Sequence, residues 1–128
     1  MQRLFNLAPA MKQHNIHLVL IQIDEAHSED AWPISVDALL DVHAVQSHKC
    51  FQDRMDRAKY FIETYKPPFD VYIDNWTNDY AETFRAWPDQ YCCVKDLKMV
   101  AKSTYNKEGG VEATVDVDIT DLIVQLIK

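Results

Sequence analysis

Short apolar blocks separated by polar residues predict a chain that alternates between helices and strands. Apolar residues recur at helical spacing over residues 2–13, which predicts a helix that Pro9 kinks or breaks. The run 17–23 is short, β-branched and almost entirely apolar, a pattern typical of a strand covered on both faces. A second short apolar run over 69–73 predicts another strand.

The middle of the chain predicts two further helices and a hairpin. An apolar stripe over 53–65 indicates a helix, and a second helix is predicted over 77–86 with Thr77 as its cap. Beyond it, 90–94 and 97–101 read as antiparallel strands joined by a two-residue turn at Lys95 and Asp96.

The remaining segments complete an α/β pattern. Residues 24–49 form a long irregular stretch, and such a stretch inside a compact domain is usually functional. Strict alternation over 111–119 predicts an extended segment, and 120–127 predicts a final helix. Strands in mixed orientation with covering helices predict one α/β domain over residues 1–128, with a mixed sheet in a three-layer arrangement.

Composition and charge exclude several classes of function. The 128 residues are 48% hydrophobic and 26% charged, which is ordinary for a folded domain. A net charge of −7 argues against nucleic acid or an anionic membrane as the main partner. The apolar runs are too short to span a bilayer and no signal peptide is visible, so a cytoplasmic protein is expected.

The cysteines and glycines exclude other kinds of site. Cys50, Cys92 and Cys93 are an odd count, which favours reduced thiols in an intracellular protein. No Cys-x-x-Cys or zinc-type spacing occurs, so we expect no metal. Gly109 and Gly110 are the only glycines, so no phosphate-binding loop is possible and no cofactor is expected.

Two polar segments carry the chemical information. Ile23-Asp-Glu-Ala-His27 leaves a predicted strand and is followed by Ser28-Glu-Asp-Ala-Trp32. Downstream, His48-Lys-Cys-Phe-Gln-Asp-Arg54 enters a predicted helix. Ligands of open α/β sheets bind beyond the carboxyl ends of the strands, so both histidines could converge there.

These segments resemble the iodothyronine deiodinases, selenocysteine enzymes built on a thioredoxin fold. The first segment looks like the family's acidic-Glu-Ala-His block with its following Ser and Trp, and the second like its His-x-x-Leu-Gln-Asp-Arg helix start. Residues 71–74 and 86–88 follow a third block, so the resemblance covers roughly residues 4–100. It implies a thioredoxin-like domain.

The resemblance also implies a site. His27, His48 and Glu25 match residues that support deiodination, and Trp32 and Arg54 are expected to line the substrate pocket. The implied substrate is a small halogenated aromatic compound, with a thiol as reductant. Histidine suits the proton donor that removal of iodine requires, because its ordinary pKa lies near neutrality.

Several features depart from the family. Its selenocysteine follows the first core strand, and both precede the segment that matches Met1, so the strand is missing from this chain or replaced. Gln22, Ala31 and Gln90 replace a Tyr, a Gly and an Arg of the family. The chain is therefore either an oxidoreductase whose nucleophile lies outside it, or an inactive interaction module of a larger complex or virion, with a protein partner or a second copy.

The missing strand normally lies between 17–23 and 90–94. Its absence would leave unpaired backbone groups, each costing about 1–3 kcal/mol if buried. We therefore expect another chain, an N-terminal extension or the segment 111–118 to fill the gap, and direct pairing of 17–23 with 90–94 would refute this.

Structural roles compete with each functional role. His27 could be a loop residue bonded to the backbone, and His48 could simply flank the helix. Glu25 could belong to a solvated acidic loop. Cys50 precedes a helix, where a thiol is activated, so it is either a reactive thiol or a buried inert one.

Overall fold

A computed structural model describes residues 2–33, 46–87, 90–103 and 123–124 of the chain. Helices and strands alternate, so the predicted α/β class is confirmed. In chain order the elements are α1 (Gln2–Gln13), β1 (Val19–Gln22), α2 (Phe51–Tyr65), β2 (Asp70–Ile73), α3 (Asp79–Phe84), β3 (Cys92–Lys95) and β4 (Lys98–Lys102).

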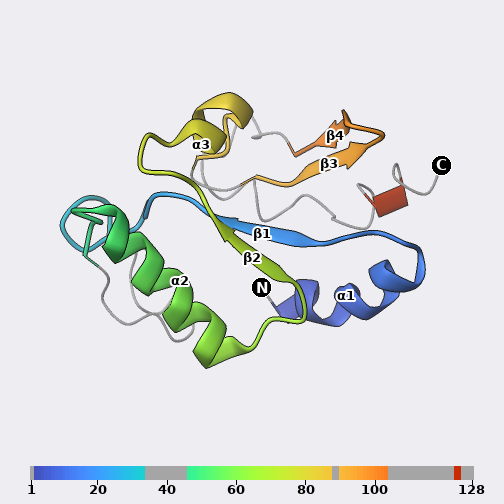
Figure 1. Cartoon of the computed structure of the whole chain (residues 1–128), viewed down its shortest axis with the longest axis horizontal. Helices are drawn as coiled ribbons and strands as arrows, with labels where there is room; N and C mark the ends of the chain where they lie inside the picture. The colour runs from blue at the N-terminus through green and yellow to red at the C-terminus, as the bar shows by residue number, and fades with distance from the viewer. Residues whose placement is uncertain (1, 34–45, 88–89, 104–122, 125–128) are drawn as a thin grey trace.

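β1 and β2 form a parallel pair that places their carboxyl ends at the same edge. Val19 is opposite Asp70, and Gln22 is opposite Ile73. The chain between the two strands includes α2, which packs against β2 through the buried Ala58. α1 and α2 lie on one side of the pair, and α3 and the β3–β4 hairpin lie on the other (Figure 1). The site segments singled out in the sequence all leave or enter this unit.

The hairpin is antiparallel, as predicted, but its turn is one residue later. β3 pairs with β4, with an irregularity between Cys93 and Val94. The two turn residues are Asp96 and Leu97, both left-handed at φ 50° and 61°, and not Lys95 and Asp96. A type I′ turn needs positive φ at both central positions. Asp tolerates that conformation, but leucine rarely adopts it, although the fully exposed Leu97 does so here. Residue preferences therefore predicted the turn one residue too early.

Within the described residues, β1 pairs only with β2, and β3 pairs only with β4. The outcome that would refute the expected gap, direct pairing of 17–23 with 90–94, is not found there. The hairpin lies beyond the β1–β2 pair as a separate two-stranded sheet (Figure 1). Filling of the gap by another strand stays a prediction.

Helix boundaries differ from the predicted ones for local reasons. α1 continues through Pro9 without a break. α2 begins at Phe51, two residues before the predicted start, because the Asp53 carboxylate accepts the N–H groups of Lys49 and Cys50 at 2.7 and 3.2 Å. These bonds, the one from Lys49 first, lower the pKa of Asp53. α3 is shorter than predicted.

The predicted cap of α3 is also wrong. Asn78 is the N-cap, in a left-handed conformation, in place of Thr77. The Thr77 hydroxyl instead donates to Asp79 at 2.7 Å. The first N–H group of the helix, that of Asp79, binds the Asn75 side-chain oxygen, and the next two bind the Asp74 carboxylate, so a hydroxyl cap is not needed.

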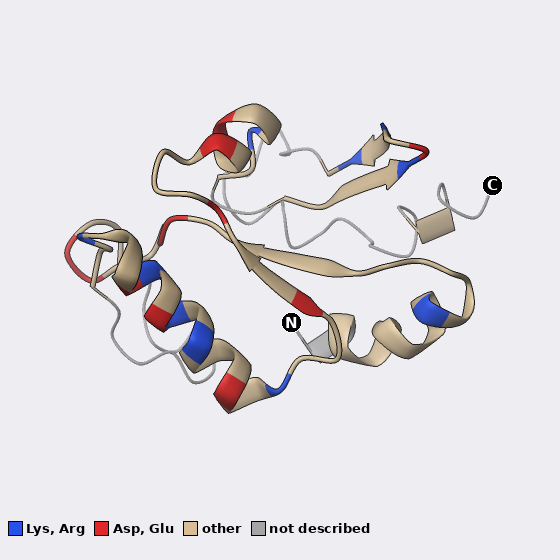
Figure 2. Cartoon of the chain, in the orientation of Figure 1, with Lys and Arg blue, Asp and Glu red and all other residues tan. Residues whose placement is uncertain are grey.

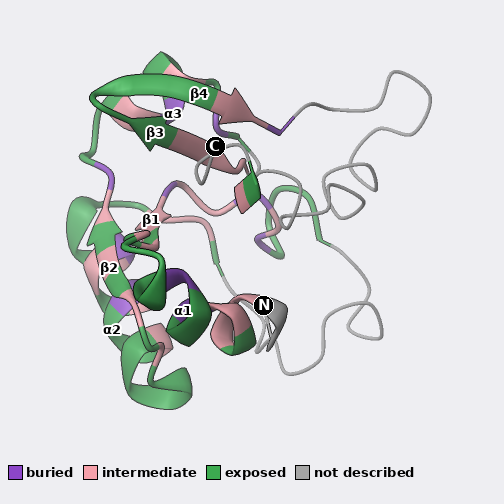
Figure 3. Ribbon diagram, turned by 90° about the vertical axis from the view of Figure 1, so that its right-hand side faces the viewer, coloured by how far each residue is buried: buried purple, intermediate pink, exposed green. Residues whose placement is uncertain are grey.

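Most of the buried apolar side chains in the described part of the chain are alanines. The set comprises Ala8, Met11, Ile23, Ala26, Ala58, Ala81 and Ala86. The two largest fully buried side chains are polar, Arg54 and Ser28. Buried residues are scattered in short stretches between exposed and half-buried ones (Figure 3). Polar contacts therefore carry much of the local organisation, above all around the candidate site.

The predicted segment 111–119 and most of the predicted helix 120–127 lie outside the described residues. A search of the described part of the chain found no helix with the length and apolar character needed to cross a bilayer.

Candidate functional site

The loop that follows β1 is tied to the segment before α2 by a serine–aspartate cluster. The Asp30 carboxylate accepts the Ser47 N–H at 2.9 Å and its hydroxyl at 2.8 Å. These bonds, the backbone one first, lower the pKa of Asp30 to about 2. The hydroxyl of the fully buried Ser28 is hydrogen-bonded to the Ser47 hydroxyl at 2.7 Å. Two parts of the chain seventeen or more residues apart are thereby held together.

His27 lies in this loop with one ring nitrogen bound to the backbone. Its Nδ1 is 3.1 Å from the carbonyl oxygen of Trp32. A carbonyl only accepts, so Nδ1 carries the proton and Nε2 is left for other groups. Nε2 has no hydrogen-bond partner among the described residues. The expected backbone bond is present, and it leaves one nitrogen available for chemistry.

A tryptophan ring lies beside His27, and a second tryptophan lies beside the first. The Trp32 ring lies 4.7 Å from the imidazole, and Trp87 lies 6.1 Å from Trp32, centre to centre. Trp32 is 41% exposed and Trp87 is 50% exposed. The structure therefore brings His27 and the predicted pocket residue Trp32 together, with an accessible aromatic face beside the imidazole.

Glu25 connects the loop to α2. One carboxylate oxygen accepts the His27 N–H at 3.3 Å, and the other lies 3.8 Å from Nε of Arg57. Both side chains are mostly buried. Acidic residues lie in the loop after β1, and both basic and acidic residues lie along α2 (Figure 2). Glu25 thus holds the backbone of His27 and is not simply part of a solvated acidic loop.

His48 is buried beside Asp24. Its side chain is 3% exposed, and its Nδ1 lies 3.3 Å from Oδ1 of Asp24. Neither ring nitrogen makes a hydrogen bond within the described structure. Asp24 is half exposed, so the pair joins the interior to the surface at the carboxyl end of β1.

Arg54 lies inside the protein, at 1% exposure. Its guanidinium donates to the carbonyls of Asp74 and Asn75 at 3.2 and 2.7 Å, and to the Asn78 side chain at 2.9 Å. It also lies 3.5 Å from Oδ1 of Asp24. Arg54 therefore joins the carboxyl ends of β1 and β2, and its contacts in this structure are internal.

Asp74 anchors α3 to the end of β2. Its buried carboxylate accepts three backbone N–H groups, from Asn75, Tyr80 and Ala81, each at 2.9 Å. A buried carboxylate with three donors is well compensated. It fixes the short helix whose N-cap is Asn78, the partner of Arg54.

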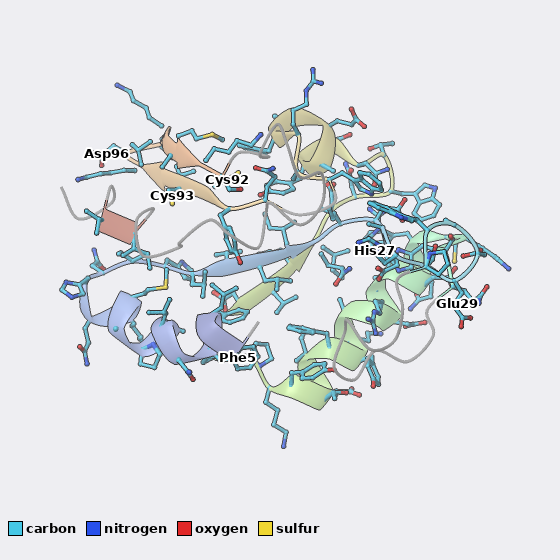
Figure 4. The ribbon with its side chains drawn as sticks, turned by 180° about the vertical axis from the view of Figure 1, so that it is seen from behind. Phe5, His27, Glu29, Cys92, Cys93 and Asp96 are labelled. Carbon is cyan, nitrogen blue, oxygen red and sulfur yellow. The ribbon has the colours of Figure 1, made fainter. Side chains whose placement is uncertain are left out.

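The three cysteines are free and lie in two places. Cys50 is exposed, directly before α2 and two residues from His48. Cys92 and Cys93 are on the hairpin, away from His27 (Figure 4). Burial, and then Cys92, raise the pKa of Cys93, and burial with Cys92 raises the pKa of Tyr80 to about 12. Cys50 is therefore the only cysteine beside the candidate site.

Sequence reasoning missed Asp24, Asp74 and Arg57, which connect the predicted residues. Their signal was position, since Asp74 directly follows β2 and Asp24 lies two residues after β1, at the edge where the carboxyl ends of parallel strands meet. No group of three or more His, Cys, Asp or Glu side chains suited to a metal ion occurs in the described ranges.

Comparison with known proteins gives one family. The family model of iodothyronine deiodinase matches residues 6–111, a range that contains every residue of the candidate site. The type I iodothyronine deiodinase of Xenopus laevis is 30% identical over 91 residues, which are 71% of this chain and 34% of that protein. The thyroxine 5-deiodinases of Gallus gallus and Aquarana catesbeiana are 26% and 30% identical over 91 residues, 71% of this chain and 33% and 32% of theirs. The matched part thus spans about a third of each relative.

Proposed function

Since this chain belongs to the iodothyronine deiodinase family of oxidoreductases with a thioredoxin-like fold, we propose that it forms the proton-donating part of a reductive dehalogenation site. His27 and His48 supply protons, and Glu25 holds the His27 backbone. The observation that carries this proposal is His27 itself. Its Nδ1 is bound to a carbonyl, its Nε2 is unpartnered within the described residues, and its ring lies against the exposed Trp32.

The reaction requires a nucleophile, a proton donor and a reductant. A selenolate or thiolate attacks the iodine of an aryl iodide, so the carbon–iodine bond breaks and a selenium–iodine or sulfur–iodine bond forms. The electron pair left on the ring carbon takes a proton from a histidine imidazolium. Two equivalents of thiol then reduce the nucleophile, with release of iodide and a disulfide.

The aromatic face at His27 suits a substrate ring. Trp32 and Trp87 offer partly exposed indole faces, and aromatic pairs contribute about 0.5–1.5 kcal/mol beyond buried area. If the substrate ring stacked on Trp32, its iodine-bearing carbon would lie near Nε2 of His27, which has no partner among the described residues. The proposed substrate class is therefore a small halogenated aromatic compound, reduced by a thiol.

The nucleophile is proposed to come from chain outside residues 1–128. Cys92 and Cys93 lie on the hairpin, away from His27, and Cys93 has a raised pKa that disfavours its thiolate. Cys50 is exposed beside the site and is the thiol within the chain that could act in peroxidase or exchange chemistry. A selenocysteine or cysteine on an additional strand next to β1 fits the dehalogenation reaction better, because it would reach the end of β1.

The test is release of iodide from an iodinated phenol with dithiothreitol, using the intact protein from its natural source. We expect the unsubstituted protein to release iodide. His27→Ala should lower kcat by about 100-fold or more, which is the usual contribution of a general acid. His17→Ala is the matched control, because His17 is exposed and pairs with Asp70 at 2.8 Å at the other end of the strands. An unchanged rate in His27→Ala, or an inert intact protein, would contradict the proposal.

A second candidate is an inactive interaction module, favoured by the separation of the described strands into two two-stranded sheets. An extended segment of a partner or second copy would then pair with the edge of β1 that carries no partner strand among the described residues. The intact mass separates the two candidates. A mass well above 14.9 kDa with a selenium isotope pattern favours the enzyme, and a mass equal to that of the 128 residues favours the module.

A further inference from the structure

The His48 imidazole is buried, and its ring nitrogens make no hydrogen bond with the described residues. Its side chain is 3% exposed. A buried polar group without a partner costs about 1–3 kcal/mol. The acceptor that can relieve this cost at Nδ1 is Oδ1 of Asp24, 3.3 Å away.

That oxygen is itself held in place. Oδ1 of Asp24 accepts the Glu25 N–H at 3.0 Å and lies 3.5 Å from the guanidinium of Arg54. Arg54 in turn is fixed by two carbonyls at the end of β2 and by Asn78. The carboxylate is therefore kept beside Nδ1 by contacts that do not involve His48.

We propose that Asp24 is a positioning residue for His48, whose carboxylate keeps a proton on Nδ1 and leaves Nε2 as the nitrogen that exchanges a proton with substrate. The inference rests on the proposed function for its catalytic consequence, but the tautomer it assigns does not. Carboxylates select histidine tautomers in this way in hydrolytic triads.

The proton inventory follows from this arrangement. The His48 imidazolium carries protons on both nitrogens, and Asp24 stabilises the charge through Nδ1. When Nε2 gives its proton to the substrate carbon, the product is the neutral Nδ1–H tautomer, which Asp24 also stabilises. Without Asp24 the neutral product would be free to hold its proton on either nitrogen.

Nitrogen NMR of the intact protein labelled with ¹⁵N-histidine tests the tautomer directly. Spectra are recorded at alkaline pH, where imidazoles are neutral, and the five histidines are assigned by substitution. We expect the proton on Nδ1 of His48 in the unsubstituted protein. Asp24→Ala should move it toward Nε2, whereas Asp24→Asn should keep it on Nδ1, because the amide oxygen is still held by the Glu25 N–H.

Asp70→Ala is the matched control, since it removes a second His–carboxylate contact of the described residues, that of the exposed His17. It should alter the His17 signals and leave His48 unchanged. A proton on Nε2 of His48 in the unsubstituted protein overturns the proposal, and that measurement needs no variant to fold. An unchanged His48 tautomer in folded Asp24→Ala overturns it as well.

Kinetics separate this inference from the proposed function. Asp24→Ala should lower kcat for iodide release by about tenfold or more with KM unchanged, and Asp70→Ala should not. If no form releases iodide but the tautomer depends on Asp24, the proposed function fails and the positioning role stands. If His48→Gln abolishes activity but the tautomer is independent of Asp24, the positioning role fails alone.

Discussion

Replacing Arg54 with Met tests whether a buried charge holds the two strand ends of the site together. The guanidinium donates to the carbonyls of Asp74 and Asn75 and to the side chain of Asn78. Met retains a similar flexible stem without the donors. The substitution therefore leaves three acceptors without their partner and removes the contact with Asp24.

The expected cost follows from these contacts. Removing one partner of a buried charged contact costs about 3–5 kcal/mol. The Asp24 part is small, because that carboxylate is half exposed and 3.5 Å away. The new Met side chain also recovers some apolar burial against Trp76, over which the guanidinium now lies at 5.4 Å. We therefore expect a loss of about 3 kcal/mol.

Urea unfolding of the intact protein, followed by tryptophan fluorescence and far-UV circular dichroism, measures this loss. With a slope of about 2 kcal/mol per M, the midpoint should fall by about 1.5 M. Arg57→Met is the matched control one turn along α2. Arg57 is a quarter exposed and has a single long ion pair, so its midpoint should fall by less than about 0.5 M.

The same pair of variants separates two roles for Arg54. If Arg54→Met is as stable as Arg57→Met and instead raises KM, Arg54 is a substrate contact and the reasoning from its burial is refuted. If stability falls as expected, the residue acts on the site by fixing Asp24 and the end of β2.

Three shorter predictions concern stability, acid behaviour and thiol reactivity. Asp74→Asn should destabilise the intact protein by about 2 kcal/mol, because an amide satisfies fewer of the three backbone donors, while the exposed Glu82→Gln in the same helix should change the urea midpoint little. The folded pKa of Asp30, about 2, lies below its unfolded value of about 4, so the ionised carboxylate stabilises the fold above pH 4 and this stabilisation is lost as the pH falls to 2. Unfolding midpoints measured over a pH series should show the loss, and Asp30→Asn should lack it. Iodoacetamide should alkylate exposed Cys50 before Cys93, whose pKa is raised, and peptide mass spectrometry that finds the reverse order would contradict the exposure argument.

The sequence predicted the elements whose signals are local. The apolar runs at 17–23 and 69–73 and the stripe at 53–65 correspond to β1, β2 and α2, because a short apolar run and a helical apolar stripe are both visible within the segment itself. The expectation that both faces of 17–23 are covered is not met, since the four residues of β1 are exposed or half-buried in the described part of the structure. The turn at Asp96 and Leu97 was misplaced, because it has no glycine or asparagine to mark it.

The contacts that organise the site were not predictable in the same way. His27, Glu25 and His48 were identified through motifs, but their partners lie up to 32 residues away along the chain. The bond between Ser47 and Asp30 and the bonds from Arg54 to Asn75 and Asn78 join segments that only the fold brings together. A sequence pattern marks which residues are unusual, and it does not state which of them will touch.

The described contacts also explain how the proposed proton-donating site can be ordered by residues of this chain alone. The loop after β1, the start of α2 and the end of β2 are held to one another by Asp30, Arg54 and Asp74. None of these bonds uses the edge of β1 that no described strand pairs with. A strand added at that edge would meet histidines that are already positioned, so it would contribute a nucleophile without having to build the proton-donating side. If the chain is instead an interaction module, the same hydrogen bonds would only hold the edge of β1 in position for a partner strand. His27→Ala would then change neither partner binding nor stability.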